Sequence, residues 1–140
     1  MKDNNPLGFQ DHTIPVEEAV TRTTQWRNLY QETMQCPDEE ILRAFFIPIE
    51  DILEIYHYYR THSVNISGVR GYLAYNPTEP ISPGVFNTDF VLCPVDLEGN
   101  DIVTAPPALG LGSGSTVYDF TQPCPTYCDT ESVLYSDTNL

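Results

Sequence analysis

Arg70 is the residue whose surroundings most strongly suggest chemistry. It lies in an apolar stretch between Gly68 and Gly71, where an arginine must be exposed or paired, because an unpaired buried guanidinium is costly. Its planar fork could hold a carboxylate or phosphate, and the glycines would let that ligand approach the backbone. The alternative is an ion pair with one of the chain's 20 acidic residues, which outnumber its 6 basic ones. We expect the ion pair, held in the protein interior, where breaking it would destabilise the fold.

His57 is the second candidate for ligand binding. It follows Glu54 by three residues on the polar side of a predicted helix, so the two side chains can meet on one helical face. A solvated Glu–His pair is the expected arrangement, and general-base catalysis is the functional alternative.

Four cysteines are present, and Cys124 and Cys128 form a Cys-x-x-x-Cys pair. This spacing misses the two-residue separation of zinc knuckles and thioredoxin-like sites. Three possibilities remain: half of a metal site, a reversible disulfide, or two reduced cysteines that pack the tail against the core. We predict that the pair organises the tail without a metal.

Other motifs give no sign of a cofactor. The sequence has no Gly-x-Ser-x-Gly elbow and no His-Glu-x-x-His, and the glycine run at 110–114 lacks the lysine of a phosphate-binding loop. The acidic segment 96–101 lacks the terminal glutamate of a calcium loop, and a hairpin turn explains it. We therefore expect no metal and no cofactor.

Length and charge restrict the classes of protein and partner. The chain has 140 residues, which fits one domain, and we expect an arm at 1–13 followed by a domain at 14–140. Its formal charge of −14 repels phosphate backbones and anionic lipids, so nucleic-acid and membrane partners are not expected. No apolar stretch approaches the length of a membrane span, and the first residues lack the apolar core of a secretion signal. A cytoplasmic location is expected.

Hydrophobic spacing predicts the elements that position these residues. Apolar residues at steps of three and four predict helices at about 15–34 and 49–60. The inward faces predicted for these helices are, in chain order, Val16, Ala19, Thr23, Trp26, Tyr30 and Met34, then Ile49, Ile52, Leu53, Tyr56 and Tyr59.

Strands and loops alternate with these helices. Strands are predicted at 41–47, 64–75, 90–95 and 116–120, with a short return strand at 102–103. A proline-marked loop is expected at 77–83, a long flexible loop at 104–115 and an irregular tail at 121–140. The order predicts an α+β fold in which two helices pack on a small, mostly antiparallel sheet.

Two segments of the chain resemble a known group of sequences. They are Gly68-Val69-Arg70-Gly71-Tyr72-Leu73-Ala74-Tyr75 and the terminal Cys124-Pro125-Thr126-Tyr127-Cys128. With residues 95–101, they resemble small uncharacterised proteins of Bacteroidota genomes over about residues 14–135. The group has no assigned activity, so the resemblance implies one compact domain and assigns no catalytic residue.

Nine tyrosines complete the functional picture. Tyrosine offers a large contact area with a polar tip, which favours protein interfaces, although the same residues could fill a small core. We predict a non-enzymatic structural or interaction module that self-associates or docks on a protein partner. The alternative is a small hydrolase or isomerase for an anionic substrate, with Arg70 as the anion clamp.

Overall fold

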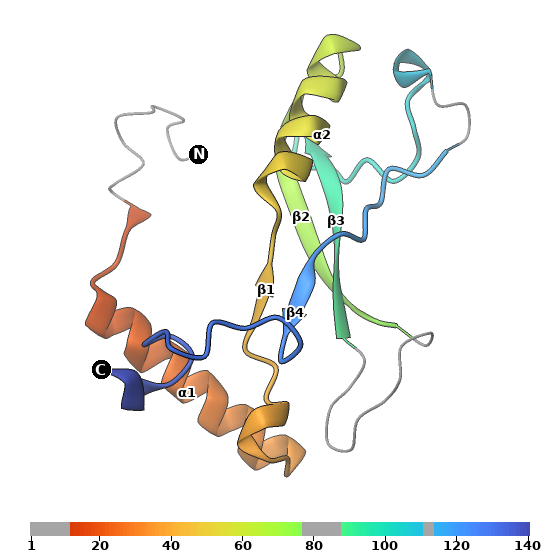
Figure 1. Ribbon diagram of the computed structural model, residues 1–140. Helices are drawn as coiled ribbons and strands as arrows, with labels where there is room; N and C mark the ends of the chain where they lie inside the picture. The colour runs from red at the N-terminus through yellow and green to blue at the C-terminus, as the bar shows by residue number, and fades with distance from the viewer. Residues whose placement is uncertain (1–11, 77–87, 111–113) are drawn as a thin grey trace.

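The computed structural model describes residues 12–76, 88–110 and 114–140, which form two helices and two small antiparallel sheets (Figure 1). The predicted α+β class is confirmed. Most of the predicted arm at 1–13, the proline-marked loop at 77–83 and part of the glycine run lie outside the described residues. The elements in chain order are α1 (Val16–Met34), β1 (Ala44–Phe46), α2 (Ile49–Thr61), β2 (Ile66–Tyr75), β3 (Thr88–Asp96) and β4 (Gln122–Cys124), with 3₁₀ turns at Asp38–Glu40, Pro107–Leu109 and Asp137–Asn139.

Helix α1 has the predicted length but turns a different face inward. Val16 and Trp26 of the predicted inner face are exposed, whereas Val20 and Arg27 are buried. The physical reason is its neighbour, because the C-terminal tail (residues 129–140) lies along α1 (Figure 1) and supplies polar groups for Arg27. The spacing of apolar residues does not predict a buried arginine, because Arg27 is buried where the tail supplies its hydrogen-bond partners.

Helix α2 differs from its prediction in the same way. Ile49, Leu53 and Tyr56 of the predicted inner face are exposed, and the buried residues are Ile55 and Tyr59. The helix carries large apolar side chains around more than one side, so its own periodicity does not fix the inward face. The segments that pack against α2 determine which of its faces is buried.

The main hydrophobic core lies beneath α2. Ile55, Tyr59 and Leu109 are its buried members, and Tyr58 donates a 2.6 Å hydrogen bond to the Leu109 carbonyl. The loop predicted at 104–115 thus contributes to the core, because Leu109, in the 3₁₀ turn Pro107–Leu109, is buried there. Partly buried residues complete the cluster: Val64, Ile66, Ile102, Ala105, Tyr118 and Phe120.

The longer sheet pairs β2 with β3. Their antiparallel register runs from Gly68 opposite Val95 to Tyr75 opposite Thr88, with a bulge between Ile66 and Gly68. The predicted strands at 116–120 and 102–103 are not regular strands, since only isolated bridges at Tyr118 and Asp101 join β3 there. The two segments bridge to the side of β3 that faces away from β2, because β2 is paired with the opposite side of β3.

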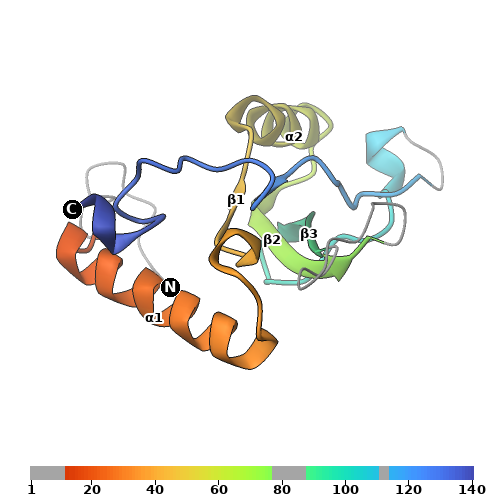
Figure 2. The ribbon, with the colours of Figure 1, turned by 60° about the horizontal axis from the view of Figure 1, so that its bottom comes forward.

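The second sheet pairs β1 with β4, and Ala44 lies opposite Cys124. The sequence places β4 inside an irregular tail, so this strand is a correction, and β1 is shorter than the predicted strand at 41–47. Figure 2 shows α1 and the tail on one side of the molecule and the β2–β3 ribbon on the other, with β1 between them. This arrangement leaves β2 at an outer edge.

Candidate functional site: the free edge of strand β2

Arg70 is paired with an acid, as expected, but at the surface. Its Nη1 donates to a carboxylate oxygen of Asp101, and its Nη2 lies 3.3 Å from the Gly99 carbonyl oxygen. The Tyr72 hydroxyl donates to the other Asp101 oxygen, and this hydrogen bond raises the pKa of Tyr72. Because 45% of the Arg70 side chain is exposed, the expectation of a stabilising interior pair is wrong: solvent weakens such pairs.

His57 does not take part in an arrangement of this kind. It is exposed on α2 with its ring beside Tyr56, and no ion pair joins it to Glu54 among the described residues. Neither Arg70 nor His57 lines either of the cavities described below. The structure therefore does not bring the two sequence candidates together.

The backbone of β2 instead presents free hydrogen-bonding groups. In β3, Leu92 exchanges two 2.8 Å hydrogen bonds with Tyr118, and the Pro94 carbonyl accepts from the Ile102 amide at 2.8 Å. These groups of Leu92 and Pro94 therefore point away from β2. Directly opposite residues of an antiparallel pair share one hydrogen-bonding type. Their partners Gly71 and Val69 consequently turn their own N–H and C=O groups outward.

The same alternation extends this outward row along the strand. Leu73 and Tyr75 have the same parity as Gly71 and Val69, so four residues present their backbone groups at the outer edge. Among the described residues no hydrogen bond involves the outward N–H and C=O groups of these four residues. We call this row, residues 69, 71, 73 and 75, the β2 edge.

Side chains on β2 are apolar and accessible. Val69, Tyr72, Leu73 and Tyr75 are all exposed, and Leu73 most of all at 68%. A long edge strand with apolar side chains and free backbone groups is a template for pairing with another chain. Arg70 is the one charged residue of the strand, and Asp101 already pairs with it.

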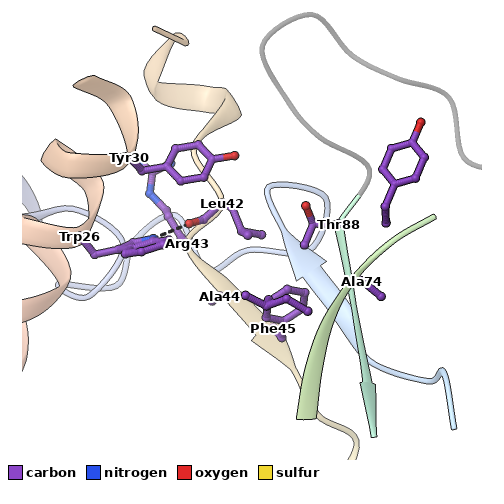
Figure 3. A pocket seen from close by; sticks show the side chains of 10 residues that line it. Trp26, Tyr30, Leu42, Arg43, Ala44, Phe45, Ala74 and Thr88 are labelled. Carbon is purple, nitrogen blue, oxygen red and sulfur yellow. Dashed lines mark hydrogen bonds between the residues drawn. The ribbon is translucent and has the colours of Figure 1, made fainter. Parts of the chain in front are cut away.

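A groove adjoins the C-terminal half of β2 (Figure 3). Its volume is about 480 Å³, and its lining combines the end of β2 with aromatic side chains from α1 and β1. One wall is fixed because the Trp26 indole N–H donates a 2.7 Å hydrogen bond to the Leu42 carbonyl. The lining residues that matter for docking are Trp26, Tyr30, Phe45, Leu73 and Tyr75.

Gly71 is required by close packing within the β2–β3 sheet. A Cβ atom at this position would lie 1.9 Å from the end of the Phe90 ring. That ring packs against Phe45 with centroids 4.8 Å apart, which joins β1 to the longer sheet. Gly71 therefore makes room for the Phe90 ring, and not for a ligand of Arg70.

A smaller cavity of about 240 Å³ lies between α2 and Tyr118. Asp51 and Glu54 line it together with aromatic side chains. Among the described residues no group of three or more His, Cys, Asp or Glu side chains is placed to hold a metal ion.

Cys124 and Cys128 are joined by a disulfide. The bond closes the turn at which the tail leaves β4, and the Tyr127 amide in this turn donates to the Pro123 carbonyl at 2.8 Å. Tyr127 also packs on Phe46 of β1, with ring centroids 5.0 Å apart. The disulfide thereby sets the direction in which the tail departs.

Two arginines hold the tail beyond this turn. Arg27 of α1 donates to the Leu134 carbonyl at 2.9 Å. Arg43, with only 3% of its side chain exposed, donates to the Tyr135 carbonyl at 3.0 Å and pairs with Asp38 at 2.9 Å. The Arg43 guanidinium also lies 4.0 Å from the centre of the Tyr135 ring. Carbonyl acceptors leave no sequence signal, so these contacts could not be found from the sequence.

Thiol titration checks the state of the four cysteines. Cys36 and Cys93 are free and buried, and burial raises the pKa of the Cys93 thiol. We expect no rapid reaction in the native protein, two reactive thiols after unfolding without reductant, and four after reduction. Four thiols in the unfolded, unreduced protein would contradict the disulfide.

The helices and the comparisons with known proteins add two further findings. Among the described residues no helix is both long enough and apolar enough to cross a membrane. No protein-family model, no curated protein and no solved structure matches this chain.

Proposed function

We propose that this protein is a non-enzymatic interaction module that binds an extended protein segment along the β2 edge. The observation that carries the proposal is the row of four residues, 69, 71, 73 and 75, whose outward backbone groups have no partner among the described residues. A segment added beside β2 would satisfy these groups, and main-chain hydrogen bonds of this kind supply affinity in strand addition.

Exposed side chains along β2 would contribute selectivity. Val69, Leu73 and Tyr75 point to one face of the strand, while Tyr72 points to the other. Alternate residues of a bound segment would contact these two sets in turn. The groove beside Leu73 and Tyr75 could receive one apolar side chain of that segment.

Charge restricts the class of partner. With a formal charge of −14, the protein should not attract nucleic acid or anionic membrane surfaces. The enzymatic alternative needs an Arg70 guanidinium that is free beside a cavity. Asp101 and the Gly99 carbonyl engage it instead, so we propose protein partners only.

The cellular compartment bears on the disulfide. A cytoplasmic location, which the sequence favours, would keep Cys124 and Cys128 as thiols, because cytosolic disulfides are rare. An oxidising compartment would preserve the bond seen in the structure. We propose that the β2 edge functions in either case, because neither cysteine belongs to it.

A displayed library of random peptides of about 12 residues tests the proposal. We expect enriched peptides with alternating apolar residues, and we expect Leu73→Lys to weaken their binding at least tenfold by placing a charge on the edge. Leu97→Lys is the matched control, because Leu97 is similarly exposed, at 61%, but lies outside both strands.

The location of binding is checked separately by amide shifts in NMR spectra. Addition of an enriched peptide should shift and protect the amides of residues 69, 71, 73 and 75. The proposal fails if no peptide is enriched, or if Leu73→Lys and Leu97→Lys bind enriched peptides equally well.

A further inference from the structure

We infer that the segment bound at the β2 edge is β2 of a second copy, so that two chains form one continuous sheet in the strand order β3–β2–β2–β3. This inference rests on the proposed function and specifies its partner. Two identical strands that pair antiparallel are related by a two-fold axis, which gives the isologous interface found in most homodimers.

Charge supports a second copy at this place. The whole chain carries −14, so two copies repel each other over most of their surface. Residues 55–78, however, contain no Asp or Glu, and they include all of β2. Arg70 is the one charge within the strand, and Asp101 of its own chain pairs with it. The β2 edge is therefore a surface on which two acidic copies can meet without facing carboxylates.

The outward backbone groups determine the register. Pairing Val69 with Tyr75 of the second copy, and Gly71 with its Leu73, satisfies all four outward residues of each strand. Each such pair exchanges two hydrogen bonds, which gives about eight across the interface. A shift by one pair of residues in one direction would leave Tyr75 opposite the bulge next to Gly68, and in the other direction Val69 would lie opposite Pro77, which has no N–H to donate. In the register that pairs Val69 with Tyr75, the two-fold axis passes between the two copies of Tyr72.

Cross-strand neighbours in this register are complementary. On one face, Leu73 lies opposite Gly71 of the second copy, whose Cβ position is covered by the Phe90 ring, so the leucine meets an apolar surface. On the other face, Arg70 lies opposite the small Ala74 side chain of the second copy. Arg70 keeps its pair with Asp101 of its own chain, which lies on the far side of β3, and Ala74 is small enough to leave that pair in place.

Cysteine cross-linking tests this register. Tyr72→Cys places two thiols across the axis at a non-hydrogen-bonded pair, whose Cα separation of about 4.5 Å permits a disulfide. We expect most of this variant to run at twice the chain mass on a non-reducing gel after mild oxidation. Tyr75→Cys is the matched control, because Tyr75 is also exposed but its two copies would lie about 20 Å apart along the strands, and it should stay monomeric on the gel.

Sedimentation equilibrium of the unmodified protein provides the second measurement. We expect a dimer whose association strengthens as salt screens the repulsion between acidic copies, and at least tenfold weaker association for Leu73→Lys than for Leu97→Lys. Equal cross-linking of Tyr72→Cys and Tyr75→Cys would overturn the register. A single 15.8 kDa species at every salt concentration would overturn the second copy as partner. If enriched peptides still bind that monomer at the β2 edge, the proposed function stands and only this inference fails.

Discussion

Replacing Tyr59 by alanine should lower the free energy of unfolding by about 3–5 kcal/mol, the range for truncating a large aromatic side chain in a core. Tyr59 is 0% exposed, and it belongs to the core cluster with Ile55 and Leu109. Its removal would leave a cavity under α2 that the short segments around it cannot fill by moving. Urea denaturation followed by circular dichroism would measure the change.

Two control variants show whether the loss of stability comes from lost core packing or from the loss of any tyrosine on this helix. Tyr56→Ala changes an exposed tyrosine of the same helix and should cost much less. Tyr59→Phe retains the ring and loses only the 3.2 Å hydrogen bond to the Tyr118 hydroxyl, so we expect about 0.5–1.5 kcal/mol. A Tyr59→Ala variant as stable as Tyr56→Ala would contradict the assignment of Tyr59 to the core.

The dependence of stability on pH gives a further check within this prediction. Burial, and then the hydrogen bond shared with the Tyr118 hydroxyl, raise the pKa of Tyr59 in the folded protein. The folded state therefore favours the neutral phenol, and its contribution is fully present below the unfolded pKa of about 10. It is lost as pH rises above that value. Above pH 10 the wild type should lose stability more steeply than Tyr59→Phe.

Replacing Gly71 by alanine should destabilise the protein by about 1–3 kcal/mol, the usual cost of overfilling a packed site. The added Cβ would meet the Phe90 ring at 1.9 Å. The ring can escape only by giving up its contact with Phe45, which weakens the connection between β1 and the longer sheet. Thermal unfolding would measure the loss.

A neighbouring glycine supplies the matched control for this prediction. Gly68 lies in the same strand, and a Cβ there meets nothing within 4 Å, so Gly68→Ala should be neutral or slightly stabilising. In a Phe90→Ala background, Gly71→Ala should cost almost nothing, because the obstructing ring is gone. Equal effects of the two glycine substitutions would show that the Phe90 contact is not the cause.

The sequence by itself determined the positions of the two helices and of the two longer strands. Regular spacing of apolar residues placed α1, α2, β2 and β3 at nearly their observed positions, because the periods of the helix and the strand are local properties of the backbone. The same reading predicted an acidic partner for Arg70, since acids are abundant in the chain. It did not identify Asp101, which is brought next to Arg70 by the turn after β3.

Tertiary structure alone decided which faces are buried and which edge is free. Helix α2 has apolar side chains on several sides, and contact with Leu109 and Tyr118 selects Ile55 and Tyr59 as the inward ones. Strand β4 is too short to show a period, and it forms because the chain returns to pair with β1. The β2 edge is free because Tyr118 and Asp101 bridge to the opposite side of β3. Such pairing joins residues far apart in the chain, and local sequence patterns do not encode it.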